Sequence, residues 1–224
     1  MKEFIKMSKR EILSFFMLSV FAGIMIGLGG TASLLAQINV EGVGRVVGAI
    51  MFSLGIYAIV IFDMKLFTGM TSDIPELGLK NSWRLALCFI GNTLGVLIVG
   101  VLVDFTALSS IKVLGTAIIT QKLASDTWVV STLCSSILCG ILITLSVKSY
   151  KYTKTKGLSA TIGVIFPIVV FAFCGFDHSV ANTLYFFHYG EFSLQIASYV
   201  LLTILGNILG GVALPLVMKI KPKE

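Results

Sequence analysis

Six long apolar runs leave this chain few possible structures other than a bundle of helices in a lipid bilayer. Windows of about 19 residues place the six runs at 12–37, 43–63, 83–105, 127–148, 158–187 and 194–218, the second continuing after an interruption to about 75. A helix needs roughly 20 apolar residues to cross a bilayer. Open or irregular backbone is not stable in the hydrocarbon core, because it finds no water partners there. The runs therefore predict an all-α membrane protein with six transmembrane helices.

The composition supports the same class. Apolar residues make up 56% of the 224 residues, charged residues only 12%, and the mean hydropathy is +0.97. These values exclude an ordinary soluble domain, so we expect residues 1–224 to form a single transmembrane domain. The cysteines show no metal-ligand spacing and lie inside apolar runs: Cys88, Cys134, Cys139 and Cys174. We expect no metal site, no other cofactor and no enzymatic reaction.

The distribution of positive charge predicts the orientation in the membrane. Thirteen of the 17 lysines and arginines lie in segments that would share one side of the bilayer. These are Lys2, Lys6, Lys9, Arg10, Lys80, Arg84, Lys148, Lys151, Lys154, Lys156, Lys219, Lys221 and Lys223. Loops that keep such charges remain in the cytoplasm. We therefore read the net charge of +6 as a sign of orientation and not of a nucleic-acid partner. The prediction is a multi-pass protein of the cell (inner or plasma) membrane, in contact with lipid, with both termini cytoplasmic.

A polar cluster interrupts the fifth run. Asp177, His178 and Asn182 stand between two apolar segments, and Gly175 precedes them. An ionisable group at this depth costs a few kcal/mol or more unless it faces protein or water. Gly175 predicts a break in the helix, and broken backbone inside a membrane lies against protein or lines a cavity. We therefore expect His178 to lie on a pore, and Asp177 to accept hydrogen bonds that fix the break.

The second run carries a matching interruption, and the chain repeats internally. Asp63 and Lys65 interrupt the apolar sequence there, and Gly69 can relieve the backbone. Residues 91–95 read Gly-Asn-Thr-Leu-Gly and are echoed by Gly-Asn-Ile-Leu-Gly at 206–210. Three crossings in each half give the halves opposite orientations. The sequence thus predicts an inverted repeat with broken second and fifth helices, its two copies spanning approximately 11–106 and 125–219.

These motifs resemble the formate/nitrite transporters over nearly the whole chain, in order and spacing. Leu-Phe-Thr-Gly at 66–69 looks like the family's Leu-Phe-Thr loop. Gly-Phe-Asp-His-Ser-Val-Ala-Asn at 175–182 is similar to its Gly-Phe-Glu-His-Ser-Ile-Ala-Asn signature, and Gly-Asn-Ile-Leu-Gly-Gly at 206–211 resembles its sixth-helix motif. The resemblance implies an aquaporin-like protomer, a homopentamer, and a small monovalent anion as the substrate.

The resemblance also implies roles for individual residues. The pore and its proton relay would comprise His178, Thr68 and Asn182. The apolar constrictions would be formed by Leu66, Ile56 and Phe171, and the vestibule charges by Lys65 and Lys122. The chain departs from the family pattern in three places: Lys65 replaces a usual Glu or Asp, Asp63 a usual glycine, and Gly140 a usual asparagine.

The favoured hypothesis is a channel or proton-coupled transporter for the anions of small weak acids, of the formate, nitrite, lactate or hydrosulfide class. A bare anion pays a large desolvation cost in an apolar slit and its neutral acid a much smaller one. His178 would hold or relay the proton, or only steer the anion. The alternatives are an aquaporin-like pore for small neutral solutes and a scaffold that conducts nothing.

Structural interpretations of several residues compete with the functional ones. Thr68 would cap the resumed second helix. Lys65 would extend to the membrane interface, and Lys122 would form an exposed loop pair with Asp126. His188 is interpreted as an interfacial residue.

Overall fold

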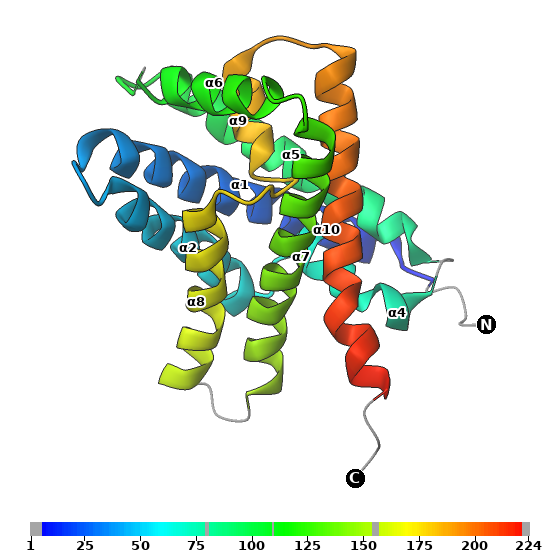
Figure 1. Ribbon diagram of the computed structural model, residues 1–224. Coiled ribbons are helices and arrows are strands. Elements are labelled where there is room, and N and C mark those ends of the chain that lie inside the picture. Colours follow the sequence, from blue (N-terminus) through cyan, green and yellow to red (C-terminus); the bar gives the residue numbers. More distant parts are fainter. Residues whose placement is uncertain (1–5, 79–80, 109, 154–156, 221–224) are drawn as a thin grey trace.

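The computed structural model describes residues 6–78, 81–108, 110–153 and 157–220, and all regular structure in this part of the chain is helical. Figure 1 shows the elements. They are α1 (Lys9–Asn39), α2 (Gly44–Ile61), α3 (Phe67–Met70), the 3-10 turn η1 (Thr71–Asp73), α4 (Ile74–Leu77), α5 (Trp83–Asp104), α6 (Ser110–Leu123), α7 (Trp128–Tyr152), α8 (Leu158–Cys174), α9 (Asn182–Tyr189) and α10 (Leu194–Ile220). The all-α prediction is confirmed.

The long helices have the surface of a membrane protein. Five of the described helices, α1, α2, α5, α7 and α10, are long and apolar enough to cross a bilayer, and α8 is a shorter apolar helix. Large apolar side chains lie on their outer faces, such as Leu102 at 62% and Leu201 at 67% exposure, whereas Asn92 and Asn207 are fully buried. This inside-out distribution fits contact with lipid. The protein is an integral membrane protein, and the count of six crossings stays a prediction.

Both predicted breaks are present. The second crossing stops at the end of α2 and resumes at α3, and the fifth stops at the end of α8 and resumes at α9. Gly175 adopts a left-handed φ of 73°, as a glycine readily does. In the second crossing the left-handed residue is Asp63, with φ 49°, and not the expected Gly69, which lies inside α3. Asp and Asn tolerate this conformation better than most residues do.

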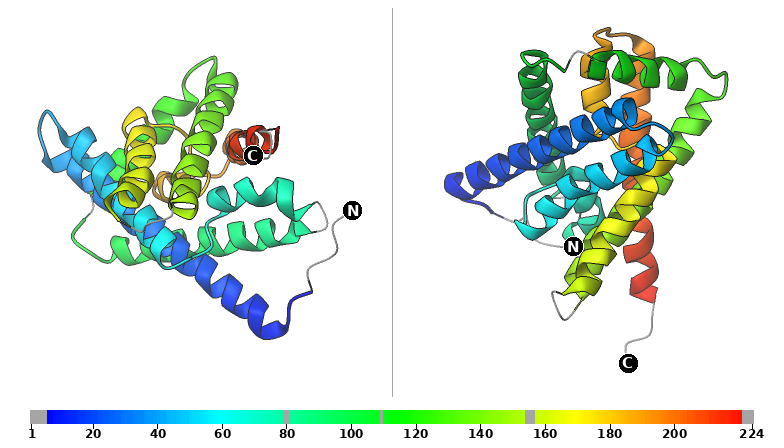
Figure 2. Two further views of the ribbon diagram at one scale, coloured as in Figure 1. Left: turned by 90° about the horizontal axis from the view of Figure 1, so that it is seen from below. Right: turned by 90° about the vertical axis from the view of Figure 1, so that its left-hand side faces the viewer.

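The two halves match element by element. α1 packs against α5 as α7 packs against α10, and α2 meets α8 between the halves. The right-hand view of Figure 2 shows α1 running obliquely beside α2. Glycines allow the close approach in each half, since a Cβ on Gly95 would overlap the Val20 carbonyl oxygen and one on Gly210 that of Ile137. The predicted limits of the repeats remain a prediction.

One helix that the sequence analysis did not anticipate joins the halves. Helix α6 packs mainly against α9, and both lie at the end of the bundle opposite the C-terminal end of α10 (Figure 1). The His188 side chain in α9 is buried, at 2% exposure, against Gly115 of α6, and its position at the membrane interface stays a prediction. Its ring makes no hydrogen bond within the described part of the chain, although Nδ1 lies 3.9 Å from a carboxylate oxygen of Asp104.

Side-chain contacts link the start of α5 to α1 and the end of α10 to α4. The Arg84 guanidinium at the start of α5 lies over the Phe15 ring near the start of α1, at 5.3 Å. Lys219 Nζ at the end of α10 donates to the Pro75 carbonyl oxygen at 2.7 Å. Several lysines behind the orientation prediction lie outside the described residues: Lys2, Lys80, Lys154, Lys156, Lys221 and Lys223.

Candidate functional site

An asparagine on α5 holds the first break in place. Asn92 Oδ1 accepts a hydrogen bond from the Phe67 amide at 2.7 Å, and Nδ2 donates to the Lys65 carbonyl oxygen at 2.8 Å. Nδ2 also donates to the Ser19 carbonyl oxygen of α1, at 2.7 Å. One buried side chain thus satisfies the backbone groups on both sides of Leu66, which a broken helix would otherwise leave unpaired.

An asparagine on α10 holds the second break in the same way. Asn207 Oδ1 accepts from the Ser179 amide at 2.8 Å, and Nδ2 donates to the carbonyl oxygens of Asp177 and Ser136, both at 2.9 Å. His178 therefore occupies the position in the second break that Leu66 occupies in the first. The repeated Gly-Asn pairs are visible in the sequence, and their matching spacing from the two breaks is the signal that could have indicated this role.

His178 and Thr68 join the two breaks. His178 Nε2 lies 2.9 Å from Thr68 Oγ1, and Nδ1 accepts from the Ala181 amide at 3.1 Å. Both side chains are almost completely buried. Because an amide N–H points at Nδ1, the hydrogen bonds assign a neutral ring with its proton on Nε2, donated to the threonine oxygen. The threonine hydroxyl keeps its own proton to offer elsewhere.

Asp177 is the centre of the polar network behind this pair. Its Oδ1 accepts from Lys122 Nζ at 2.7 Å, from Asn182 Nδ2 at 3.1 Å and from the Tyr199 hydroxyl. The carboxylate is buried, and its own amide donates to Ser135 Oγ at 2.9 Å. These contacts match the expectation that Asp177 fixes the break. Tyr199 was not anticipated, since an aromatic residue in an apolar helix carries no signal of this kind.

Two cavities border the two breaks, one toward each end of the bundle. The first, which we call the His178 cavity, has a volume of about 500 Å³ and is bordered by His178, Asn182, Phe171 and Lys122 among others. The second, the Lys148 cavity, has a volume of about 490 Å³ and is bordered by Leu66, Lys65 and Lys148 among others. Ser131 borders the first and Val147 the second. Sixteen residues of α7 separate these two, which corresponds to about 24 Å at 1.5 Å per residue.

A buried apolar side chain borders each cavity. Leu66 borders the Lys148 cavity, and Phe171 borders the His178 cavity, with its ring stacked at 5.7 Å on the imidazole of His178. Ile56 is fully buried but borders neither cavity. Phe52, one turn earlier on α2, borders the His178 cavity and meets Phe171 edge-on at 5.4 Å. Phe52 was missed, because helices that are apolar all round give no phase for choosing between such positions.

The predicted vestibule lysines each border a cavity, and each is in an ion pair. Lys65 Nζ lies 2.7 Å from Asp63 in the Lys148 cavity. Lys122 does not pair with Asp126 as the structural interpretation had it, because Asp177 is its partner, with a further bond to the Gly175 carbonyl oxygen at 3.0 Å. Arg45 was overlooked: it borders the His178 cavity and lies 5.5 Å from the Phe173 ring.

No metal centre is visible in the part of the chain that the structure describes, where no three His, Cys, Asp or Glu side chains gather. Cys88 and Cys139 are buried and Cys134 and Cys174 exposed, all four as free thiols.

Comparisons with known proteins agree with this architecture. The sequence profile of a family described as "Formate/nitrite transporter" matches residues 1–220. The formate channel FocA of Haemophilus influenzae is 30% identical over 196 residues, which cover 79% of this chain and 66% of that protein, just under two thirds of its length. The nitrite transporter NirC of Salmonella typhimurium is 26% identical over 224 residues, covering 92% of this chain and 82% of that protein.

Solved structures share the fold. A structure described as "Pentameric formate channel with formate bound" has a TM-score of 0.78 at 20% identity, covering 95% of this chain and 98% of that one. A structure described as "FNT family ion channel" has a TM-score of 0.77 at 24% identity, covering 94% and 91%.

Proposed function

The chain belongs to the formate/nitrite transporter family, a family of transport proteins and not of enzymes, and from this premise we propose that it carries small monovalent anions of weak acids across the cell membrane. Candidate substrates are formate, nitrite, lactate and hydrosulfide. The observation that carries the proposal is the arrangement of the two cavities. Each is lined by cationic side chains and by a buried apolar side chain, Phe171 or Leu66, and the buried pair of Thr68 and His178 joins the two breaks that the cavities border.

The arrangement favours anions on both sides and the neutral acid in the middle. Cationic walls raise the local concentration of anions, by roughly 10-fold or more in clefts of this kind. The apolar layer opposes a bare charge, which loses many kcal/mol of hydration in a low-dielectric medium. The neutral conjugate acid loses far less. Passage as the acid makes the flux depend on the proton gradient as well as on the anion gradient.

The hydrogen bonds of His178 favour one role for its ring. A neutral imidazole that gave up the Nε2 proton would become an anion, so direct protonation of a substrate requires a second proton on Nδ1. That nitrogen already accepts from the Ala181 amide. Nε2–H already donates to Thr68, so a hydrogen bond to the substrate from the Thr68 hydroxyl is the one that breaks no existing bond. We therefore assign Thr68 as the neutral donor that orients the substrate at the layer, and His178 as the neutral ring that holds the Thr68 oxygen rather than as a proton store, with Asn182 supporting them through Asp177.

The assembly is proposed by likeness. The solved structure described as pentameric has the same fold, and its alignment covers 95% of this chain. The long helices here carry exposed apolar side chains that lipid or a neighbouring copy would cover. We propose a homopentamer with one pathway in each protomer.

Flux into proteoliposomes tests the function. We expect uptake of formate, nitrite, lactate or hydrosulfide to rise when the outside is made acidic, because more of the substrate is then neutral at the layer. His178→Asn should reduce the flux by about 5- to 100-fold, corresponding to about 1–3 kcal/mol for one buried hydrogen bond. The variant protein must assemble as the parent does.

Other outcomes would contradict the proposal. Flux that responds neither to pH nor to the identity of the anion, with water or ammonia passing freely, supports the neutral-solute pore. The absence of flux for every solute supports a non-conducting scaffold. Unchanged anion flux in an assembled His178→Asn protein would remove the role given to the ring.

A further inference from the structure

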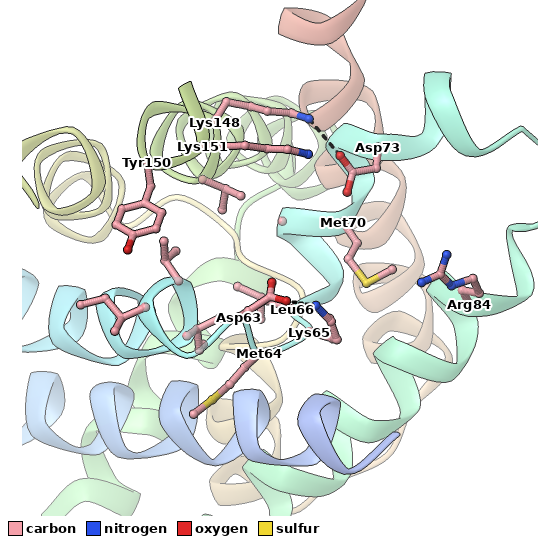
Figure 3. Close-up of a pocket in the computed structure, with 15 residues that line it drawn as sticks. Asp63, Met64, Lys65, Leu66, Met70, Asp73, Arg84, Lys148, Tyr150 and Lys151 are labelled. Atoms are coloured by element: carbon pink, nitrogen blue, oxygen red, sulfur yellow. Dashed lines mark hydrogen bonds and ion pairs between the residues drawn. The ribbon is translucent and has the colours of Figure 1, made fainter. Parts of the chain in front are cut away.

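A buried lysine of α7 forms an ion pair with the resumed part of the second crossing. Lys148 is only 4% exposed, and its Nζ lies 2.9 Å from Asp73 Oδ1. Figure 3 shows the Lys148 side chain reaching from α7 to Asp73 at the edge of the Lys148 cavity. A buried ammonium is strongly destabilised when its counter-charge is removed, so the two side chains act as a unit. The charge pattern of the sequence did not predict this pairing.

Asp73 belongs to the short segment that carries Thr68. It is the last residue of η1, which follows directly on α3. Two hydroxyl groups bind η1 to α3: Thr71 Oγ1 donates to the Thr68 carbonyl oxygen at 2.7 Å, and Ser72 Oγ donates to that of Gly69 at 2.8 Å. Both bonds are buried and therefore shielded from competition by water. The position of Asp73 thus determines where the Thr68 side chain lies.

Small and apolar groups make further contacts between this segment and the second half of the chain. A Cβ on Gly211 of α10 would overlap Thr71 Oγ1, and a Cβ on Gly69 would lie 3.3 Å from Val147 of α7. Apolar packing has no preferred direction, whereas a charge-assisted hydrogen bond has a preferred length and direction. The bond from Lys148 therefore fixes the segment against α7 in a way that packing alone does not.

A comparable ion pair lies at the second break. Lys122 of α6 is 2.7 Å from Asp177, whose side chain is buried. In both pairs the carboxylate belongs to a broken crossing, the ammonium comes from another helix, and one partner is buried. The two residues that join the breaks, Thr68 and His178, are thus each followed or preceded closely by a paired carboxylate.

We propose that Lys148 and Asp73 are positioning residues for transport, which hold α3 and η1 against α7 so that the Thr68 hydroxyl stays in contact with His178. The inference rests on the proposed function, in which that hydroxyl orients the substrate. Thr68 Oγ1 lies 2.9 Å from His178 Nε2, so a shift of about 1 Å would break the bond. A misplacement of this size in an active site can cost about 100-fold in rate.

The pair also borders the Lys148 cavity, so its positioning role must be separated from a simple effect of charge. If the cavity acted through its positive charge alone, neutralising Asp73 would raise that charge and increase the anion flux. If the pair positions Thr68, neutralising either partner lowers the flux. The sign of the change in Asp73→Asn therefore separates the two roles.

Formate uptake into proteoliposomes supplies the first measurement. We expect Lys148→Met to lower the maximal flux about tenfold with the half-saturating formate concentration nearly unchanged, because the orienting donor is displaced. Asp73→Asn keeps an acceptor oxygen but not the charge, so its loss should be smaller. The double variant should lose no more than Lys148→Met alone, since the same pair is removed. Lys112→Met and Asp126→Ala are the matched controls with parent flux, because both residues are exposed and border neither cavity.

The second measurement asks whether the pair acts through Thr68. In a Thr68→Val background, Lys148→Met should cause no further loss of formate flux, because the hydroxyl that the pair positions is already absent. The fall in unfolding temperature caused by Lys148→Met should be the same in both backgrounds, since the ion pair is lost in each. A merely structural role would instead lower the flux by the same factor in both.

Two results would overturn the positioning role. One is an unchanged or higher flux in an Asp73→Asn protein that assembles as the parent does. The other is an equal loss of flux from Lys148→Met with and without the Thr68 hydroxyl. If Lys148→Met does not assemble, Asp73→Asn is compared with Thr68→Val in the same way. Failure of the proposed function is a different result, because the parent protein would then carry no pH-dependent formate flux.

Discussion

At the scale of single residues, the site depends on which buried N–H and O–H donors are not already engaged in hydrogen bonds within the protein. His178 uses Nδ1 for the Ala181 amide and Nε2–H for Thr68, so the ring is held in one orientation and one tautomer. Thr68 is the only member of this chain of bonds with a proton still to donate. Its own carbonyl oxygen accepts from Thr71 Oγ1 at 2.7 Å, which fixes its backbone too. The pair therefore presents a preorganised hydroxyl to whatever reaches the layer.

Removing that hydroxyl should impair transport more than folding. Thr68→Val keeps the shape of the side chain but leaves the Nε2–H of His178 without its acceptor. A buried donor without a partner costs about 1–3 kcal/mol of free energy. We expect the anion flux to fall by about 5- to 100-fold at every pH. The shape of the pH profile should stay unchanged, because protonation of the substrate, and not of the His178 ring, determines it. Thr68→Ser keeps the hydroxyl and serves as the control, with near-parent flux. A pH profile that moves in Thr68→Val would contradict the neutral role of His178.

At the scale of elements, each broken crossing is supported by a helix from its own half. Asn92 on α5 pairs the backbone around Leu66, and Asn207 on α10 pairs the backbone around His178. Glycines one turn away let α5 and α10 come close enough to α1 and α7 for these bonds to form. The two asparagines thus pair backbone groups that the breaks free, on both sides of Leu66 and of His178.

Changing one amide to an acid tests this support. Asn207→Asp loses the two N–H bonds to the Asp177 and Ser136 carbonyl oxygens and places a carboxylate among them. We expect a loss of about 2–5 kcal/mol in stability, measured as a lower unfolding temperature of the detergent-solubilised protein. Asn39→Asp makes the same substitution on an exposed residue at the end of α1 and should leave the unfolding temperature nearly unchanged. Equal behaviour of the two variants would show that Asn207 does not hold the break.

Some elements were predictable from the sequence and others were not, for physical reasons. Polar residues inside apolar runs carry a strong signal, so the breaks and the pairing of His178 with Thr68 followed from the residues and the resemblance. The residue at which the second crossing turns was not predicted correctly, because an aspartate such as Asp63 indicates left-handed backbone more weakly than a glycine such as Gly69 does. Helix α6 was missed because residues 110–123 are too short and too polar to span a bilayer. Phe52 was missed since membrane helices lack an apolar stripe that marks the inner face.

At the scale of the whole molecule, charge is distributed unequally between the two ends. The described end that holds the Lys148 cavity carries Arg84, Lys148, Lys151 and Lys219, together with the starts of α1 and α5 and the end of α10. The other end, with α6 and α9, carries Arg45, Lys112 and Lys122. Lysine and arginine near the ends of spans favour the cytoplasmic side. The Lys148 cavity is therefore expected to open to the cytoplasm and the His178 cavity to the outside.

Single cysteines at the two ends would test this orientation. Phe192, 88% exposed between α9 and α10, lies at the α6 and α9 end, and Leu158, 76% exposed, begins α8 at the opposite end. In intact cells, a membrane-impermeant thiol reagent should label Phe192→Cys above the level of the parent chain and leave Leu158→Cys at that level. Inside-out vesicles should give the reverse pattern. If Leu158→Cys reacts from outside, the Lys148 cavity faces away from the cytoplasm, and the orientation inferred from the lysines and arginines is wrong.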